Sequence, residues 1–256
     1  SINLTDEQRA LLKEISDPIF QQVVRDFCTN QQFRRDYWIK GVRSLNSLEQ
    51  TEQLHELSVV LVQPRVGIDP KISGSLGEAT LQQAIYNPLF DMLADNKPKK
   101  IGQIAAEAER QKIAFAPILQ AIILLCGSGS LKVAQDQTII QQVAKRTSKL
   151  NAYLMQKARS SADITYLVSP VTGGGISVPR FYQLFLLACQ QRKQAKSHSA
   201  PELAQFAWTI LSSQGQRLAK EGKALETAEA NLAELTAVAE KFLNKHLPVY
   251  QALQII

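Results

Sequence analysis

The chain has 256 residues, 45% of them hydrophobic and 20% charged, which is enough for one large domain or two to three small ones. Its formal net charge of +6 permits an anionic partner without demanding one, because so small a surplus spreads easily over the surface. Three widely spaced cysteines exclude a disulfide framework and a clustered zinc site, which favours a cytoplasmic protein. No apolar run approaches the ~20 residues of a membrane span, so no membrane partner is expected. Because the chain starts with Ser1 rather than Met, we expect a fragment of a longer protein.

The first predicted elements are two amphipathic helices. Thr5 and Gln8 form the sequence pattern of a capping box at the start of the first helix, and Pro18 stands at the first position of the second. Asn30 is expected to end the second helix. Apolar residues in the second helix repeat at the spacing of a face that packs into a core. This predicted buried stripe consists of Phe20, Val23, Val24, Phe27 and Cys28.

Short strands and loops are predicted next. Residues 37–39 and 57–62 have the composition of strands, and the second of these is the more apolar. Pro64, Gly67 and Pro70 interrupt the chain after it. Residues 72–78 are expected to form a loop or an edge hairpin, while residues 79–86 fit a helix or a strand equally well. Helices are then predicted at 89–94, 101–108 and 117–126, followed by a strand at 131–134.

Three short helices followed by a strand are typical of a winged-helix-like unit. The third helix is apolar nearly all round, with Gln120 among aliphatic neighbours, so we expect it to be buried. A recognition helix needs Arg, Lys, Asn or Gln side chains that reach base edges and phosphates. Nucleic acid is therefore not expected as a partner, although a winged-helix nucleic-acid-binding protein is kept as the alternative.

The rest of the chain is predicted to be mostly helical. The expected elements are helices at 138–159, from Pro179 onward, at 201–214 and at about 225–246, a strand at 164–168, and a polar, basic linker at 190–200. We therefore predict an α+β fold that is predominantly α-helical, with short strands, a winged-helix-like middle unit and C-terminal helices. The predicted divisions are residues 1–86, 87–168 and 169–256.

A search for catalytic chemistry is negative. The three histidines are isolated, so no metal site is expected. The glycines at 173–175 follow a predicted strand, as in a nucleotide-binding loop, but ten residues separate that strand from the next helix. A tight turn is the expected structure there. Residues 127–130 lack the Gly-x-Ser-x-Gly pattern and fit a helix end instead. We expect no catalytic, cofactor or metal site in this chain.

Two runs carry a resemblance to a known family. Asp26-Phe27, a polar spacer and Phe33-Arg34 lead into an apolar segment, and this run resembles the signature of the methyltransferase regulatory domain, with Gln32 where the family has an Arg. Residues 169–187 resemble a second, downstream run of that family, with its Ser-Pro-Val, Gly-Gly-Gly-Ile and Arg-Phe-x-Gln-Leu-Phe pattern. The resemblance covers roughly residues 20–110 and 149–190.

The resemblance implies a role without catalysis. In some bacterial proteins this domain follows a class I S-adenosylmethionine-dependent methyltransferase domain, so a Rossmann-type catalytic domain is expected before Ser1. The chain is also similar to regions of bacterial protein-lysine methyltransferases that flank the active site and help to bind the protein substrate. The implied function is a regulatory or substrate-recognition region of a protein methyltransferase. Its implied partners are the catalytic domain of the same full-length chain and a protein substrate.

The candidate interaction surface is Arg34, Arg35, Tyr37 and Trp38. Arg and aromatic side chains are enriched in the cores of protein interfaces. The equal alternative is a half-buried strand whose edge is covered by the aliphatic stems of the two arginines. These two interpretations stay open at the level of the sequence.

Overall fold

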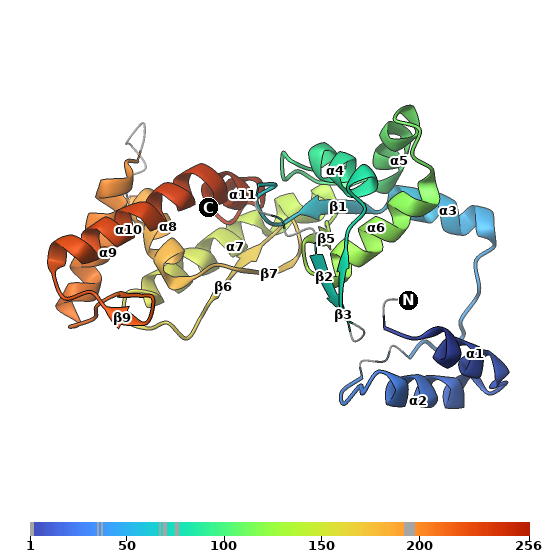
Figure 1. Cartoon of the computed structure of the whole chain (residues 1–256). Coiled ribbons are helices and arrows are strands. Elements are labelled where there is room, and N and C mark those ends of the chain that lie inside the picture. Colours follow the sequence, from blue (N-terminus) through green and yellow to red (C-terminus); the bar gives the residue numbers. More distant parts are fainter. Residues whose placement is uncertain are drawn as a thin grey trace.

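The computed structural model describes residues 3–34, 36, 38–66, 68, 71–74, 77–191 and 198–256. Most of these residues lie in helices, and the strands are short and antiparallel, so the prediction of a mainly helical α+β fold is confirmed. Figure 1 shows a helical hairpin at the N-terminus, a middle unit of helices around a small sheet, and a C-terminal unit of longer helices. The division at residues 86 and 168 stays a prediction.

The N-terminal hairpin consists of α1 (Asp6–Glu14) and α2 (Pro18–Cys28). The predicted capping box is confirmed, because the Thr5 hydroxyl accepts a hydrogen bond from the Gln8 amide at 3.2 Å and the Thr5 amide donates to Gln8 Oε1 at 2.9 Å. Gln21 Nε2 donates to the carbonyl of Leu12 at 2.6 Å and ties the two helices together. Asn30, with a φ of +50°, follows the end of α2 as predicted.

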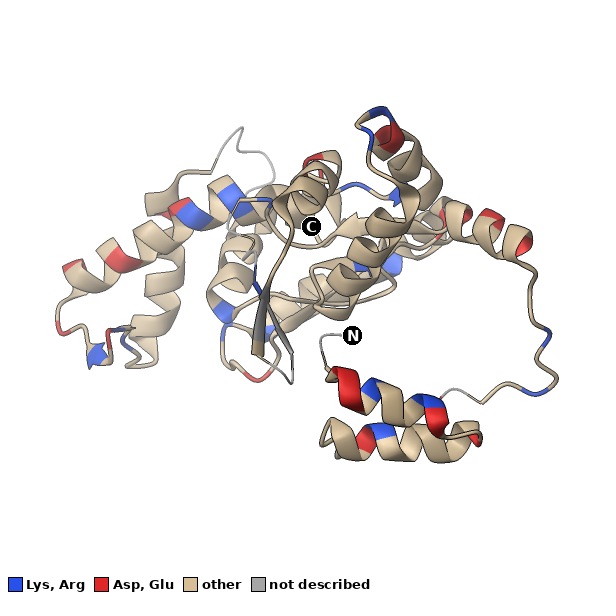
Figure 2. Cartoon of the chain, turned by 45° about the vertical axis from the view of Figure 1, so that its right-hand side comes forward, with Lys and Arg blue, Asp and Glu red and all other residues tan. Residues whose placement is uncertain are grey.

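The predicted burial of the α2 stripe is wrong. No residue of α2 is buried, and the side chain of Phe27 is 82% exposed. The hairpin stands apart from the other units in Figures 1 and 2, so in the described part of the chain no element covers this face. The spacing of Phe20, Val23 and Phe27 reports that one face of the helix is apolar. It does not report whether the partner of that face belongs to this chain.

The strand predicted at residues 37–39 is also wrong where the structure describes it. Trp38 and Ile39 have irregular backbone and exposed side chains, while Arg35 and Tyr37 lie outside the described residues. A β-prone segment needs a neighbouring strand to satisfy its backbone, and among the described residues none pairs with this one. The chain continues to α3 (Ser47–Glu56), a helix that was not predicted and that starts with a capping box of Asn46 and Glu49.

The middle unit is built on a three-stranded antiparallel sheet in the order β4-β1-β5. Its strands are β1 (Ser58–Leu61), β4 (Lys99–Lys100) and β5 (Leu131–Val133). The helices that pack on it are α4 (Gln83–Met92), α5 (Ile101–Arg110) and α6 (Phe115–Gly127). Residues 72–78 were predicted as a loop or an edge hairpin, and the structure has a separate hairpin there of β2 (Lys71–Gly74) and β3 (Gly77–Thr80). Gly67 and Pro70 lie outside the described residues.

Two details of the helices differ from the prediction. Helix α4 begins at Gln83 and contains Pro88, whereas the sequence predicted a helix that starts after this proline. Proline removes one hydrogen bond of the helix, but buried Tyr86 and Leu89 anchor the turns on either side of it. Helix α6 is buried on one face only, because Ile123 is 61% exposed. The order from α4 to β5 resembles a winged helix, with β1 as an added strand, and that comparison stays an interpretation.

The C-terminal unit encloses the larger core. Its elements are α7 (Gln137–Lys157), β6 (Tyr166–Ser169), β7 (Gly174–Ser177), α8 (Arg180–Gln191), α9 (Ala200–Ser213), β8 (Ala219–Lys220), β9 (Lys223–Ala224), α10 (Ala228–Lys241), the π turn η1 (Phe242–His246) and α11 (Leu247–Ala252). Gly173, with a φ of +66°, lies in the connection between β6 and β7, so the tight turn predicted at the triple glycine is confirmed. Residues 192–197 of the predicted linker lie outside the described residues.

Buried polar side chains hold the C-terminal residues in place. Asn151 Nδ2 donates to the carbonyls of Val168 and Ile255 at 2.8 and 2.9 Å, and the Ser169 hydroxyl donates to the carbonyl of Leu253 at 2.7 Å. Each of these side chains is fully buried, so its hydrogen bonds satisfy groups that water does not reach. The segment after α11 is therefore an integral part of this core.

We expect Phe242→Ala to lower the free energy of unfolding of the C-terminal unit by about 3–5 kcal/mol, the range for truncating a buried Phe. The Phe242 ring is fully buried and packs against Phe185 and Tyr182. Phe27→Ala removes an exposed ring and should change the free energy of unfolding by less than about 0.5 kcal/mol. Denaturant unfolding of both variants measures the contrast, and equal losses would contradict the exposure of Phe27.

Candidate functional site

Arg34 is the best defined of the four predicted surface residues. Its Nη1 lies 3.0 Å from Asp26 Oδ2 on α2, and its Nε lies 2.9 Å from the carboxylate of Asp36. The hydrogen bond and charge of Asp36, followed by those of Asp26, raise the pKa of the guanidinium. Arg34 thereby connects the segment after α2 to the helix itself. Its charge is engaged within the unit, which the sequence did not predict.

The other predicted residues are only partly visible. Trp38 is 88% exposed and lies four positions after Arg34, so the structure keeps both in one surface segment. Arg35 and Tyr37 lie outside the described residues. The interpretation of a half-buried strand does not hold for Trp38, whereas the role of the four residues as an interaction surface stays a prediction.

Large apolar side chains are exposed throughout the same segment. We name this set the N-terminal apolar surface. It consists of Ile19, Phe20, Val23, Phe27, Phe33, Trp38, Ile39 and Val42. Phe27, Phe33 and Trp38 are each more than 80% exposed, although soluble proteins normally cover such side chains. The sequence carried a signal for this surface, because apolar residues after Asn30 follow neither a helical nor a strand period.

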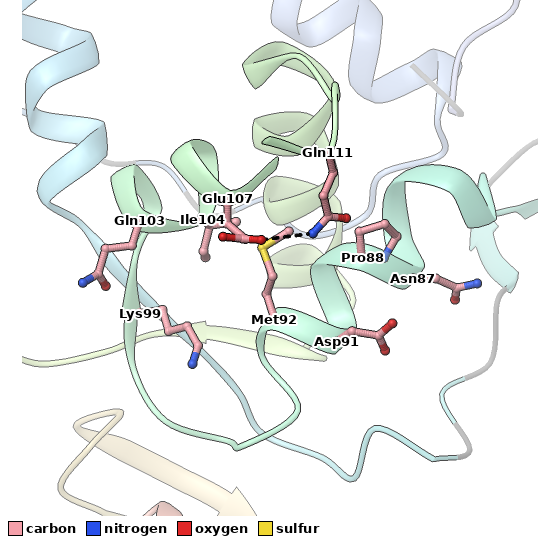
Figure 3. A pocket seen from close by; sticks show the side chains of 9 residues that line it. All are labelled: Asn87, Pro88, Asp91, Met92, Lys99, Gln103, Ile104, Glu107 and Gln111. Atoms are coloured by element: carbon pink, nitrogen blue, oxygen red, sulfur yellow. Dashed lines mark hydrogen bonds between the residues drawn. The ribbon is translucent and has the colours of Figure 1, made fainter. Parts of the chain in front are cut away.

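A cavity of about 580 Å³ lies in the middle unit between α4, β4 and α5. Figure 3 shows its polar lining, in which Gln111 donates a hydrogen bond to Glu107. Each charged group that lines it has a partner. Asp91 pairs with Arg65 at 2.9 Å, Lys99 with Asp95 at 2.8 Å, and Glu107 with Arg110 at 2.6 Å. The cavity therefore offers no unpaired charge for acid–base chemistry.

Metal-ligating and thiol side chains are the other candidates for reactive chemistry. Within the described ranges, no group of three His, Cys, Asp or Glu residues is placed to hold a metal ion. Burial raises the pKa of the Cys189 thiol to about 11, so it stays protonated at neutral pH and is a poor nucleophile. Among the helices that the structure describes, none has the length and apolarity to cross a lipid bilayer.

Comparison with known proteins identifies the N-terminal segment. Residues 1–40 match the family described as a predicted methyltransferase regulatory domain. This match contains Asp26 to Arg34, so the resemblance inferred from that run is confirmed. The second run, at 169–187, lies outside the matched residues and its assignment stays a prediction. The exposed apolar side chains at positions 19–39 all lie within the match.

Two further proteins align with nearly the whole chain. It is 37% identical over 255 residues to a Synechocystis sp. protein named "Uncharacterized protein sll1526", an alignment that covers 100% of this chain and 49% of that protein. The chain thus spans about half the length of this curated relative. An alignment with the structure of PKMT2 from Rickettsia typhi covers 94% of this chain and 52% of the PKMT2 chain, at 15% sequence identity. Its TM-score of 0.37 is too low for residues or roles to be transferred.

We expect Arg34→Ala to leave the thermal midpoint of the chain unchanged, because both of its ion pairs are exposed to solvent. The loss of these pairs should release the segment from α2, so amide hydrogen exchange of residues 33–39 should become faster. Arg43→Ala is the matched control, because this exposed arginine has no ion pair among the described residues. If Arg34→Ala lowers the thermal midpoint and Arg43→Ala does not, Arg34 stabilises the fold itself rather than only holding the segment against α2.

Proposed function

Because the chain carries the predicted methyltransferase regulatory domain in residues 1–40, we propose that it is a regulatory or substrate-recognition region of an S-adenosylmethionine-dependent protein methyltransferase. In this proposal the chain has no catalytic site and acts through protein–protein contacts. Its main partner is the catalytic domain of the same full-length protein, outside residues 1–256. The observation that carries the proposal is the N-terminal apolar surface, all of which except Val42 lies within the matched segment.

The size of the exposed side chains supports docking. A Phe or Trp side chain buries about 150–250 Å² at an interface, which contributes roughly 4–6 kcal/mol at ~25 cal/mol per Å². Phe27, Phe33 and Trp38 are the most exposed aromatic residues that the structure describes. The value for their burial is an upper bound, from which an entropy cost of association of about 4–15 kcal/mol is subtracted. Aromatic anchors of this kind dominate binding in protein interfaces.

The ion pairs of Arg34 prepare this surface for binding. They link the segment that carries Phe33 and Trp38 to α2, which carries Phe27. Side chains that are already ordered lose less conformational entropy when a partner arrives. Arg34 therefore positions the aromatic anchors, and in this proposal its removal weakens docking indirectly.

A partner within the same protein fits the length of the relative. The Synechocystis protein is about twice as long as this chain, which leaves space for a catalytic domain of similar size. Two units on one chain meet at a high effective concentration, so a moderate apolar surface is enough to hold them together. Figure 2 shows charged residues on both helices of the hairpin, which are Asp6, Glu7, Arg9, Lys13 and Glu14 on α1 and Arg25 and Asp26 on α2. In this proposal they keep the hairpin in solution when its apolar surface is not covered.

We expect the double variant Phe33→Ala, Trp38→Ala to be folded and as stable as the parent in the 256-residue chain, because both side chains are exposed. In the full-length protein the same variant should lower the thermal midpoint and reduce methyl transfer to a protein substrate at least several-fold. The proposed surface pair Arg34→Ala, Arg35→Ala should reduce methyl transfer in the same way.

The matched control is Ile123→Ala, Val133→Ala, which truncates two exposed apolar side chains of the middle unit. Differential scanning fluorimetry and a methyl-transfer assay measure both variants in both proteins. An N-terminal variant that behaves like this control in the full-length protein would remove the basis of the docking proposal.

The alternative, a winged-helix nucleic-acid-binding protein, has little support from α6. The exposed positions of this helix are Ala116, Gln120, Ile123 and Gly127, none of which carries a positive charge. We therefore expect the chain to bind duplex DNA weakly, without sequence preference, and with loss of binding as salt rises. A gel shift at about 150 mM salt that separates one sequence from its scrambled form would favour the alternative.

A further inference from the structure

A second cavity, of about 460 Å³, lies where the middle and C-terminal units meet. We name it the junction cavity. Its polar lining consists mainly of Lys132 on β5, Tyr166 on β6, Tyr182 on α8, Lys241 and His246 at the π turn, and Tyr250 on α11. Its volume lies within the range of about 300–1,000 Å³ that is usual for small-molecule sites. Neither the family match nor the N-terminal surface involves these residues.

The π turn brings two of the polar groups together. In an α-helix, residues five positions apart point in directions about 140° apart, since each turn takes 3.6 residues. A π turn has hydrogen bonds from residue i to i+5, which places such residues nearly above one another. Lys241 and His246 are five positions apart across the η1 segment, and both line the cavity. Helical irregularities of this type occur frequently at functional sites.

Aromatic rings form one wall of the junction cavity. The His246 ring lies 4.8 Å from Tyr182 and 6.2 Å from Tyr250, measured between ring centroids. Both tyrosine rings also pack on Phe242 in the core. Burial raises the pKa of both tyrosines, so their hydroxyls keep their protons and can donate hydrogen bonds. Neither hydroxyl has a hydrogen-bond partner in the described part of the chain, so both are available to a ligand.

The charge of this lining has one sign. Two lysines line the cavity, and no Asp or Glu is among its lining residues. Lys132 donates one hydrogen bond to the carbonyl of Gly175 at 3.0 Å, which leaves two further N–H groups on its ammonium. Lys241 forms no ion pair with any described residue. The cavity near β4, by contrast, has its charges paired within the protein.

We propose that the junction cavity binds a small organic anion whose planar apolar body lies against Tyr182 and Tyr250 and whose charged group contacts Lys241 and His246. The aromatic wall favours a flat apolar body, while the two ammonium groups and the tyrosine hydroxyls favour a carboxylate or phosphate ester. A cationic ligand of the same shape is repelled by the lysines. This site is independent of the docking that is proposed for the N-terminal apolar surface.

Isothermal titration of the 256-residue chain with phenyl phosphate tests the proposal. We expect saturable binding at a single site, weaker binding of inorganic phosphate, and no binding of benzylamine. Lys241→Gln should weaken phenyl phosphate binding by roughly tenfold, the loss expected for a hydrogen bond to a charged group. Tyr250→Phe, which removes only a hydroxyl, should weaken it to a smaller extent.

The matched control is Lys245→Gln, which removes the same charge from the adjacent π turn at an exposed residue that does not line the cavity. Lys245 affects the site only through its charge near His246, so this variant should lose much less affinity than Lys241→Gln. Equal losses in Lys241→Gln and Lys245→Gln would show a general effect of positive charge and would overturn the site. So would binding of benzylamine as tight as that of phenyl phosphate, or no saturable binding of phenyl phosphate.

Discussion

Strand β1 lies between the two larger cores, and its consecutive side chains enter them alternately. Val59 and Leu61 belong to the core of the middle unit, whereas Val60 belongs to the core of the C-terminal unit. All three are almost completely buried. Successive side chains of a strand point to opposite faces, so four residues are enough to join two cores. A shift of one residue in register would exchange the faces and disrupt both units.

The surroundings of β1 fix this register. The strand pairs with β4 on one side and β5 on the other, and buried Asn96 donates hydrogen bonds to the carbonyls of Leu61 and Gln63 at 2.8 and 3.1 Å. The junction cavity opens beside the end of this strand, at residues 62–64. The N-terminal hairpin has no such connection to either core. The chain between this hairpin and the middle unit contains α3, and the apolar side chains Phe20, Val23 and Phe27 of the hairpin are exposed.

Local chemistry in the sequence predicted the ends of several elements, although it misplaced the start of α4 at Pro88 and missed the capping box of α3. The cap at Thr5, the end of α2 at Asn30 and the turn at Gly173 each depend on side chains or backbone freedom within a few residues. The sequence placed Phe27 in the core because periodicity shows only that a helix face is apolar. It does not distinguish a face that is buried within the chain from one that is exposed. The junction cavity was beyond prediction, since its lining comes from the segment after β1, from β5, β6, β7 and α8, and from the end of α10, η1 and α11. Only the tertiary fold brings these segments together.

The buried hydrogen bonds to residues 253–255 affect the order in which the units can fold during synthesis. Asn151 and Ser169, near the centre of the sequence, find their acceptors on the carbonyls of Ile255 and Leu253. The chain emerges from the ribosome with its N-terminus first. The C-terminal unit therefore lacks these acceptors until almost all residues of that unit have emerged. The middle unit draws its core from residues 59–131 and can close much earlier. Within residues 1–256, the middle unit, with β1 in place, can therefore fold before the C-terminal unit completes its core.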